Sequence, residues 1–193
     1  MCNPHKTPNS IISIQTRDLE NHIIPFFDFV KKIVGADKYL FPVFRRSKNS
    51  VELIERAMLN IQVLRDEGVP QSNIVKFLIN RPTTLMTSTV RFKEILQEIR
   101  GMGFDPSKYA FMRAIHAITA MTKSTWETKL NAYRKWGLSE EQIQHAFMLS
   151  PFSMMHSVKK ISSIMDYLVN RMGISSSHIA KVPTVLLGEE DHT

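Results

Sequence analysis

The chain has 193 residues, of which 43% are hydrophobic and 22% are charged, so it can bury a core and is neither fibrous nor low in complexity. Lys and Arg outnumber Asp and Glu by 25 to 18, a net charge of +7, which favours a polyanionic partner such as nucleic acid or an anionic membrane surface. A single cysteine, Cys2, excludes an internal disulfide framework and fits a reducing compartment.

The first 34 residues divide into a tail and a helix. Residues 1–10 lack the apolar core of a secretory signal and the Arg-rich amphipathic pattern of an organelle presequence, and we expect a disordered tail there. Residues 19–34 are predicted to form the second helix of a partial leading unit. The chain contains no run of about 18 apolar residues, so we expect no membrane-spanning helix.

Five glycines then mark a repeat of about 34 residues. They are Gly35, Gly68, Gly103, Gly137 and Gly173, with separations of 33, 35, 34 and 36 residues. A near-constant period in this range is typical of a helical solenoid. Glycine also suits the position just after a helix, where the backbone turns left-handed, so each glycine is predicted to end one helix.

The residues after each glycine predict where the next helix starts. In four of the five units the second position holds a residue that favours a helix N-cap: Asp37, Asp105, Ser139 and Ser175. Apolar residues at the first and sixth positions would flank that cap as a hydrophobic staple. Ser139 followed by Gln142 adds the pattern of a capping box.

Two units carry a proline 14 residues after their glycine, Pro82 and Pro151, which ends the first helix because proline cannot continue a helix interior. A longer helix with an apolar stripe at helical spacing follows. The chain shows no alternating strand pattern, so it is predicted to be all-α. The last unit stops after Leu187, before a long second helix, and apolar surface exposed at this end would offer a place for a protein partner.

The period alone leaves tetratricopeptide and pentatricopeptide repeats open, and the internal proline argues against both. Residues 68–85, GVPQSNIVKFLINRPTTL, residues 137–143, GLSEEQI, and residues 182–187, VPTVLL, resemble the motifs of the mitochondrial transcription termination factor (mTERF) family. The resemblance implies repeats of two α-helices and a short 3-10 helix after the proline, stacked in a curved α-solenoid of either hand. We therefore expect one repeat domain over residues 11–187, with units starting near 35, 68, 103, 137 and 173, and a disordered tail at 188–193.

The resemblance also implies a function. Members of this family bind double-stranded DNA or RNA in a basic concave groove, in mitochondria or chloroplasts. They act in transcription, its termination, or RNA splicing and processing, and they use no cofactor. This chain departs from the family pattern in its third unit, where His116, Ala117 and Ile118 stand in the region of the proline.

Binding along a phosphate backbone needs cations spaced on one side of the solenoid. Arg91 and Lys160 each stand nine residues after a proline, at equivalent places on the long helices. The other candidates lie on the long helices or in the regions between helices: Lys129, Lys159, Arg45, Arg46 and Lys123. Such contacts would position the backbone without reading bases, and the plainer alternative is a solvated helix face.

Catalysis and metal binding find no support in the sequence. The seven histidines show no paired metal-ligand spacing and no Gly-rich phosphate loop occurs, so we expect no enzyme and predict no catalytic or metal-binding residue. Trp126, Tyr133 and Trp136 have the chemistry to stack on bases, but their helical spacing favours a place in the core. The remaining alternative is a helical-repeat scaffold that binds protein in a concave face and depends weakly on salt.

Overall fold

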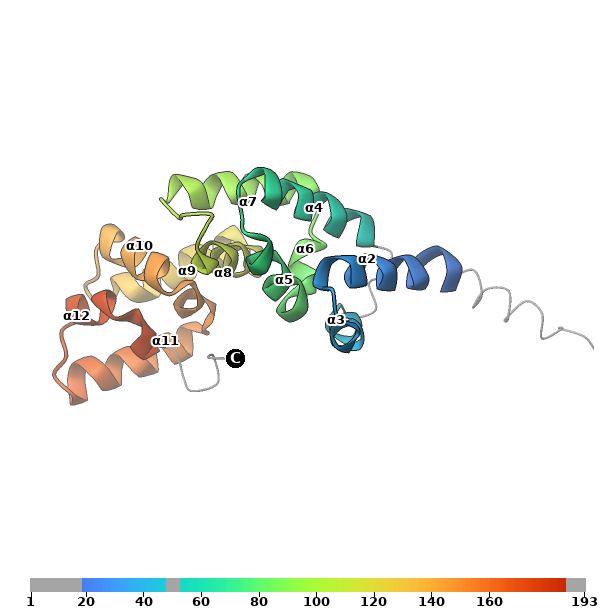
Figure 1. Ribbon diagram of the computed structural model, residues 1–193. Helices are drawn as coiled ribbons and strands as arrows, with labels where there is room; N and C mark the ends of the chain where they lie inside the picture. Colours follow the sequence, from blue (N-terminus) through green and yellow to red (C-terminus); the bar gives the residue numbers. More distant parts are fainter. Residues whose placement is uncertain (1–18, 48–52, 187–193) are drawn as a thin grey trace, which may run out of the picture.

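A computed structural model describes residues 19–47 and 53–186, and every element within these ranges is helical. The tails expected at 1–10 and 188–193 lie outside the described residues. The helices follow one another along an elongated, curved molecule (Figure 1). The prediction of an all-α fold with curved helical repeats is confirmed.

The first part of the molecule holds the leading helix and units 1 and 2. In chain order its elements are η1 (Leu19–Ile23, a π-helical turn), α2 (Ile24–Val34), η2 (Asp37–Tyr39), α3 (Leu40–Arg46), α4 (Ile54–Asp66), α5 (Gln71–Asn80), α6 (Pro82–Leu85) and α7 (Thr89–Gly101). The first helix of each unit is therefore α3 or α5, and the second, longer helix is α4 or α7.

The second part holds units 3 to 5. Its elements are α8 (Tyr109–Thr119), α9 (Lys123–Arg134), α10 (Glu140–Leu149), η4 (Pro151–Met155), α11 (Val158–Asp166), η5 (Tyr167–Arg171, π-helical), α12 (Ser176–Lys181) and η6 (Pro183–Leu186). Here α8, α10 and α12 are first helices, and α9 and α11 are second helices.

All five repeat glycines end a helix in the predicted way. Their φ angles lie between 68° and 89°, in the left-handed region that side chains with a Cβ disfavour. At Gly35 the backbone N–H donates to the carbonyl of Lys31 and so closes α2. The sequence prediction for these five positions is confirmed.

The predicted helix starts are confirmed at two of the four candidate caps. Ser139 and Gln142 form the full capping box, and the Ser175 hydroxyl accepts the His178 N–H. The prediction is wrong at Asp105, whose carboxylate accepts the Ser107 N–H at 2.8 Å, because it closes a local turn and α8 begins only at Tyr109. It is also wrong at Asp37, which lies inside η2.

The bend after the first helix takes three forms. Pro151 and Pro183 open 3-10 segments, η4 and η6, as the resemblance implied. Pro82 instead opens a single α-helical turn, α6, so the expectation of a 3-10 helix is wrong for unit 2. Unit 3 has no proline, and α8 continues through Ala117 to Thr119.

Buried polar side chains donate hydrogen bonds to the backbone at the proline bends of units 2 and 4. Asn60 in α4 is fully buried, and its Nδ2 donates to the carbonyls of Leu85 and Thr87, at 2.8 Å each. Lys129 in α9 is 7% exposed, and its Nζ donates to the carbonyl of Met154 at 2.6 Å. In both cases a second helix donates to the backbone at the bend of the following unit.

These two donors occupy the same register of the repeat. Asn60 stands eight residues before Gly68, and Lys129 stands eight residues before Gly137. The same position before Gly103 holds Ile95, which is apolar and fully buried. Ile95 precedes unit 3, where α8 runs on without a proline bend and keeps its carbonyls inside the helix. In units 2 to 4 donor and bend therefore occur together, whereas unit 5, whose bend opens at Pro183, has the buried apolar residue Met165 at this position.

The core is a continuous apolar layer that runs through all the units, and Phe26, Phe77, Phe92, Phe111 and Phe147 are among its largest side chains. Its main contacts join elements of the same unit or of successive units, with α2 against α5 as the exception. Figure 1 shows α4 and α7 lying along one long side of the arch, and α11 and α12 at its far end. Tyr133 is buried in this core, and Trp126 and Trp136 pack against it, so the prediction for the three aromatics is confirmed.

Candidate nucleic-acid interface

Arg91 and Lys160 have the equivalent positions that the sequence indicated. Each is the third residue after the N-cap of a second helix, where its backbone N–H donates to the cap hydroxyl of Ser88 or Ser157. The corresponding residue of unit 3 is Thr125, whose N–H donates to Thr122. The cations Lys159 and Lys160 are exposed in the first turn of α11.

Lys129 is not a surface cation, and this corrects the expectation that it faces a phosphate. Unit 3 has no proline that fixes the register, and Lys129 lies one turn beyond Thr125, the residue that corresponds to Arg91 and Lys160. Burial lowers the pKa of the Lys129 ammonium, and its proton is donated to the carbonyl of Met154. We therefore assign Lys129 a structural role at the bend of unit 4.

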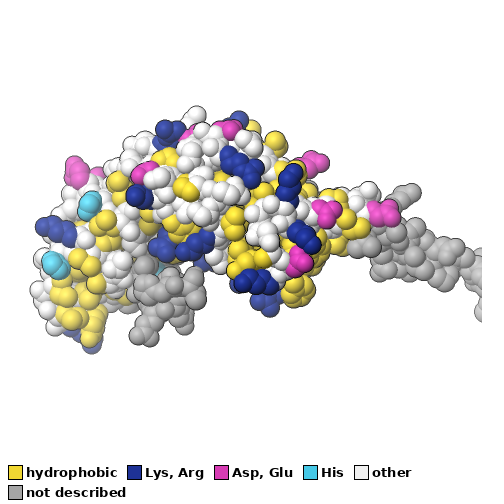
Figure 2. Space-filling model, in the orientation of Figure 1, with side chains coloured by type: hydrophobic (Ala, Val, Ile, Leu, Met, Phe, Trp, Pro, Cys, Tyr) yellow, Lys and Arg dark blue, Asp and Glu magenta, His cyan; other side chains and the backbone are white. Residues whose placement is uncertain are grey.

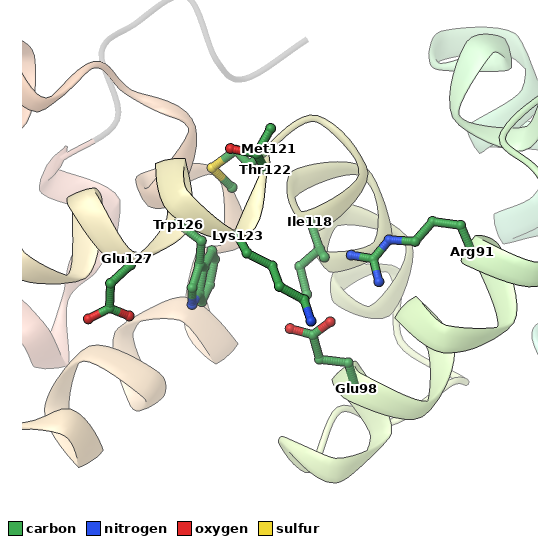
Figure 3. Close-up of a pocket in the computed structure, with 8 residues that line it drawn as sticks. All are labelled: Arg91, Glu98, Ile118, Met121, Thr122, Lys123, Trp126 and Glu127. Atoms are coloured by element: carbon green, nitrogen blue, oxygen red, sulfur yellow. The ribbon is translucent and has the colours of Figure 1, made fainter.

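Arg91 and Lys123 meet in one pocket between α7 and α9. The pocket has a volume of about 250 Å³, and Trp126, Ile118 and Met121 supply its apolar wall. In Figure 3 the Lys123 side chain reaches toward the Glu98 carboxylate, and the Arg91 guanidinium lies on the opposite side of the pocket from Lys123. The lining also holds two carboxylates, Glu98 and Glu127. Arg91 also forms an ion pair with Glu94 at 3.1 Å.

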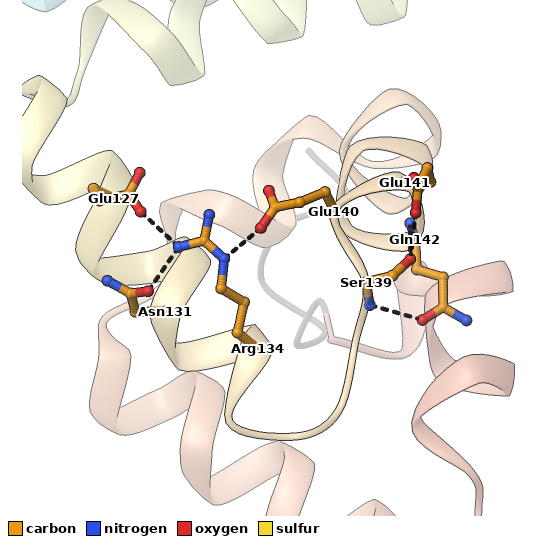
Figure 4. A network of polar contacts seen from close by, with 7 residues as sticks. All are labelled: Glu127, Asn131, Arg134, Ser139, Glu140, Glu141 and Gln142. Atoms are coloured by element: carbon orange, nitrogen blue, oxygen red, sulfur yellow. Dashed lines mark hydrogen bonds and ion pairs between the residues drawn. The ribbon is translucent and has the colours of Figure 1, made fainter.

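Other arginines on the second helices are paired with carboxylates in the same way. Arg100 in α7 pairs with Glu67, and Arg134 at the end of α9 pairs with Glu127 and Glu140. Figure 4 shows the Arg134 guanidinium between these two carboxylates, with Asn131 as a further acceptor. The second-helix face therefore carries many cations but much less free positive charge than the sequence suggests.

Arg45 and Arg46 lie in the last turn of α3, and both are exposed. Arg46 Nη1 donates to the carbonyl of Ile79, near the C-terminal end of α5, at 3.3 Å. This hydrogen bond holds the Arg46 side chain across the junction of units 1 and 2. The structure thus places this predicted pair beside the first helix of unit 2 and away from the pocket of Arg91 and Lys123.

A second group of cations, which the sequence did not indicate, forms where units 2, 3 and 4 meet. Lys76 of α5 stands over the ring of Tyr109, with Nζ 4.5 Å from the ring centre. The Arg113 guanidinium of α8 lies 5.6 Å from the Tyr109 ring and 5.4 Å from the Phe152 ring. Arg81, just before the bend, lies 5.9 Å from Phe152. These five residues are called the cation–aromatic cluster below.

The cation–aromatic cluster surrounds a small pocket of about 60 Å³. Its lining consists of the five cluster residues together with Phe77 and Asn80, and it contains no carboxylate. Within the described residues, none of the cluster's three cations takes part in an ion pair. This pocket therefore concentrates uncompensated positive charge, unlike the pocket between α7 and α9.

The cluster contains and contacts titratable groups that are neutral at pH 7. His116 packs between Phe77 and Phe152, and its Nδ1 lies 2.7 Å from the Thr84 hydroxyl. Burial, with a smaller contribution from Arg81, lowers the pKa of His116 to about 4, so the ring is neutral at pH 7. Burial also raises the pKa of Tyr109, which keeps its hydroxyl protonated as a donor.

Charge is unevenly spread over the face of the molecule seen in Figure 2. Lys and Arg side chains lie on both the upper and the lower side of the middle of the molecule, whereas most Asp and Glu side chains on this face lie along its upper edge and toward α2. The candidates predicted from the sequence were placed on the long helices or between helices, and none was placed on a first helix. One signal was available: Lys76, Arg81 and Arg113 fall outside the apolar stripe of their units.

Two-helix units closed by left-handed glycines and stacked on their neighbours define a helical-repeat protein. The model of one such family, mTERF, matches residues 5–189, and the chain belongs to the mTERF family. Comparison with curated proteins gives no match.

Membership in the mTERF family has general consequences for function. Its members are in general helical-repeat proteins that bind nucleic acid, have no enzymatic activity and serve gene expression in organelles. None of the helices in residues 19–47 and 53–186 is both long and apolar enough to cross a membrane. Within the same ranges, His, Cys, Asp and Glu side chains form no group of three that could hold a metal ion.

Proposed function

We propose that this protein binds the phosphate backbone of nucleic acid and regulates gene expression in a mitochondrion or chloroplast, in transcription, its termination, or RNA splicing and processing. The observation that carries the proposal is the cation–aromatic cluster. Its three cations converge from two first helices onto a pocket without a carboxylate. Such a site attracts a polyanion and releases its counterions on binding.

The proposed contact surface extends from the cluster in two directions. Arg45 and Arg46 continue it along the first helices toward unit 1, since Arg46 is bonded to the end of α5. The exposed pair Lys159 and Lys160 adds charge at unit 4. Arg91 and Lys123 are weaker candidates because carboxylates surround them. These contacts position a backbone and carry no base sequence information.

Two triple variants test which surface is used. The cluster variant carries Lys76→Gln, Arg81→Gln and Arg113→Gln, and the matched second-helix variant carries Arg91→Gln, Lys93→Gln and Lys123→Gln. Fluorescence anisotropy would measure binding to double-stranded DNA and single-stranded RNA, both with hydroxyl ends, from low to moderate salt. We expect the cluster variant to bind at least about tenfold more weakly and to lower the salt slope by roughly 2 to 3, near 0.9 for each phosphate that is no longer neutralised.

The possible outcomes test the choice of contact surface and nucleic-acid binding separately. A second-helix variant that loses more affinity than the cluster variant would show that the long helices carry the interface after all. Two variants that bind like the wild type would refute both surfaces. A wild-type protein that binds neither ligand at low salt would refute nucleic-acid binding itself.

The alternative function, a scaffold that binds protein, is favoured by one observation at the end of the described chain. Tyr167, Met172, Val182 and Val185 are each between 44% and 54% exposed, an apolar group on the last units of the kind that marks interaction sites. Binding to a protein partner there would change little with salt, and neither triple variant would alter it.

A further inference from the structure

The rings of the cation–aromatic cluster are already covered by cations. Lys76 and Arg113 both lie near the Tyr109 ring, and Arg81 and Arg113 both lie near the Phe152 ring. A nucleobase that stacked on either ring would have to displace a cation from it. The same contacts restrain the flexible cation stems, so that less conformational freedom is lost when the charged ends meet an anion. The cluster is therefore arranged for an anion and not for a base.

The size of the pocket limits which anion can enter. At about 60 Å³ it is far smaller than sites for whole small molecules, which begin at roughly 300 Å³, but it has room for a group of a few heavy atoms. Buried Phe77 closes it on one side. A phosphate within a strand has a sugar on each side and runs along an open surface, whereas a phosphate at the end of a strand can point into a closed pocket.

Charge favours the same ligand. A phosphate monoester carries about −1.5 to −2 charges at pH 7, and a diester carries one. The guanidinium groups of Arg81 and Arg113 suit bidentate contacts to phosphate oxygens, and Lys76 adds a third positive charge. The lining holds no carboxylate to repel a dianion, and the Tyr109 hydroxyl adds a neutral donor, while Asn80 donates to the carbonyl of Lys76.

We propose that the cation–aromatic cluster binds the terminal phosphate of a nucleic-acid strand, so that the protein prefers phosphorylated strand ends over internal backbone. This proposal rests on the proposed function, because it places the end of the same polyanion in the same pocket. The rest of the strand lies on the surrounding cations, among them Arg46, which is hydrogen-bonded to the end of α5.

The test compares the ends of otherwise identical ligands. One duplex and one single strand would each be prepared with a 5′-phosphate, a 3′-phosphate or hydroxyl ends only, and circular DNA would supply a ligand without ends. We expect the wild-type protein to bind at least one phosphorylated end about tenfold more tightly than the hydroxyl-ended ligand. Arg81→Gln with Arg113→Gln should abolish this ratio, and the charge-matched pair Lys93→Gln with Lys135→Gln, two exposed lysines outside the proposed contact surface, should retain it.

Each result has a distinct meaning. Equal wild-type affinity for phosphorylated and hydroxyl ends, with binding intact, overturns the terminal-phosphate proposal and leaves the proposed function standing. A phosphate preference that survives in the Arg81 and Arg113 variant also overturns it, because the preference would then arise elsewhere. Absence of binding to every ligand overturns both proposals. The wild-type comparison needs no variant, so a folding defect in the double variant does not remove the test.

Discussion

The burial of Lys129 decides whether this residue contacts phosphate or holds the bend of unit 4. Its stem enters the core between α9 and η4, and its ammonium meets the carbonyl of Met154. We expect Lys129→Ala to lower the free energy of unfolding by about 1–3 kcal/mol, because a buried carbonyl loses its donor, and to leave nucleic-acid affinity unchanged. Urea denaturation and anisotropy on the same samples measure both quantities.

Lys159 is the control for that substitution, since it is exposed and on a neighbouring helix. Lys159→Ala should change stability by no more than about 0.5 kcal/mol. A Lys129→Ala protein with wild-type stability and weakened nucleic-acid binding would return Lys129 to the contact surface.

His116 gives the protein a pH-dependent stability. Its pKa of about 4 in the folded state lies below the ordinary value of 6.5, so the unfolded chain binds the proton more readily. Stability is therefore full above pH 6.5 and falls as the pH drops from there toward 4, by roughly 1–2 kcal/mol at pH 5. Denaturation midpoints of wild type and His116→Gln between pH 8 and pH 5 measure the effect. The variant should lose this component of the slope, whereas His145→Gln, an exposed control, should keep it.

At the scale of residues, the sequence predicted the place of a residue within its repeat better than the partners of its side chain. The equivalence of Arg91 and Lys160 followed from counting, because both stand behind a proline and a serine cap. Counting could not show that Glu94 pairs with Arg91 or that Arg81 and Arg113 share one ring, since these depend on how neighbouring units stack. The proposed site lies where three units meet, and no single repeat motif contains it.

Among elements, the proline bend of unit 2 depends on Asn60. Its amide donates to two carbonyls that α6 leaves without helical partners. We expect Asn60→Ala to destabilise the protein by about 1–3 kcal/mol and Asn60→Asp to destabilise it more, because a carboxylate would face those carbonyls. Thermal or urea denaturation measures the order. Gln62→Ala, on the exposed side of α4, should be close to neutral, and an Asn60→Asp protein more stable than Asn60→Ala would contradict this account.

The elements themselves were largely predictable. The glycines ended helices at all five expected places because left-handed backbone leaves few other choices. Helix starts were harder to predict. The Asp105 carboxylate can accept a hydrogen bond either as a helix N-cap or within a local turn, and in the structure it closes the turn. The α-helical form of the turn after Pro82 was not accessible to a pattern that specifies only where the proline stands.

Across the whole molecule, contacts between successive units predominate, so damage should remain local. We expect Asn60→Ala to raise amide hydrogen exchange in α4 to α7 and to leave α10 to α12 protected. Lys129→Ala should have the reverse pattern. Hydrogen exchange followed by mass spectrometry measures both, and a uniform rise along the chain in either variant would show that the units unfold as one.

The period of the glycines was enough to predict a stack of helical units. It did not predict where free positive charge would lie, because that depends on which cations find a carboxylate across a unit boundary. Arg100 and Arg134 do so, with Glu67 and Glu140 from adjacent elements. Lys76, Arg81 and Arg113 do not, within the described residues.

Because the bend of unit 2 and its donor Asn60 depend on each other, unit 3 cannot acquire the same bend through one stable substitution. A proline introduced at Ala117 would turn unit 3 into the bent kind, but it would free carbonyls opposite Ile95, which has nothing to donate. An asparagine introduced at Ile95 alone would bury an amide against an unbroken α8. Either change is unfavourable alone, and only the two together reproduce the arrangement of Asn60. In units 2 and 4 of this chain the donor and the proline stand 22 residues apart, and a change of unit 3 into the bent form requires both substitutions at that spacing.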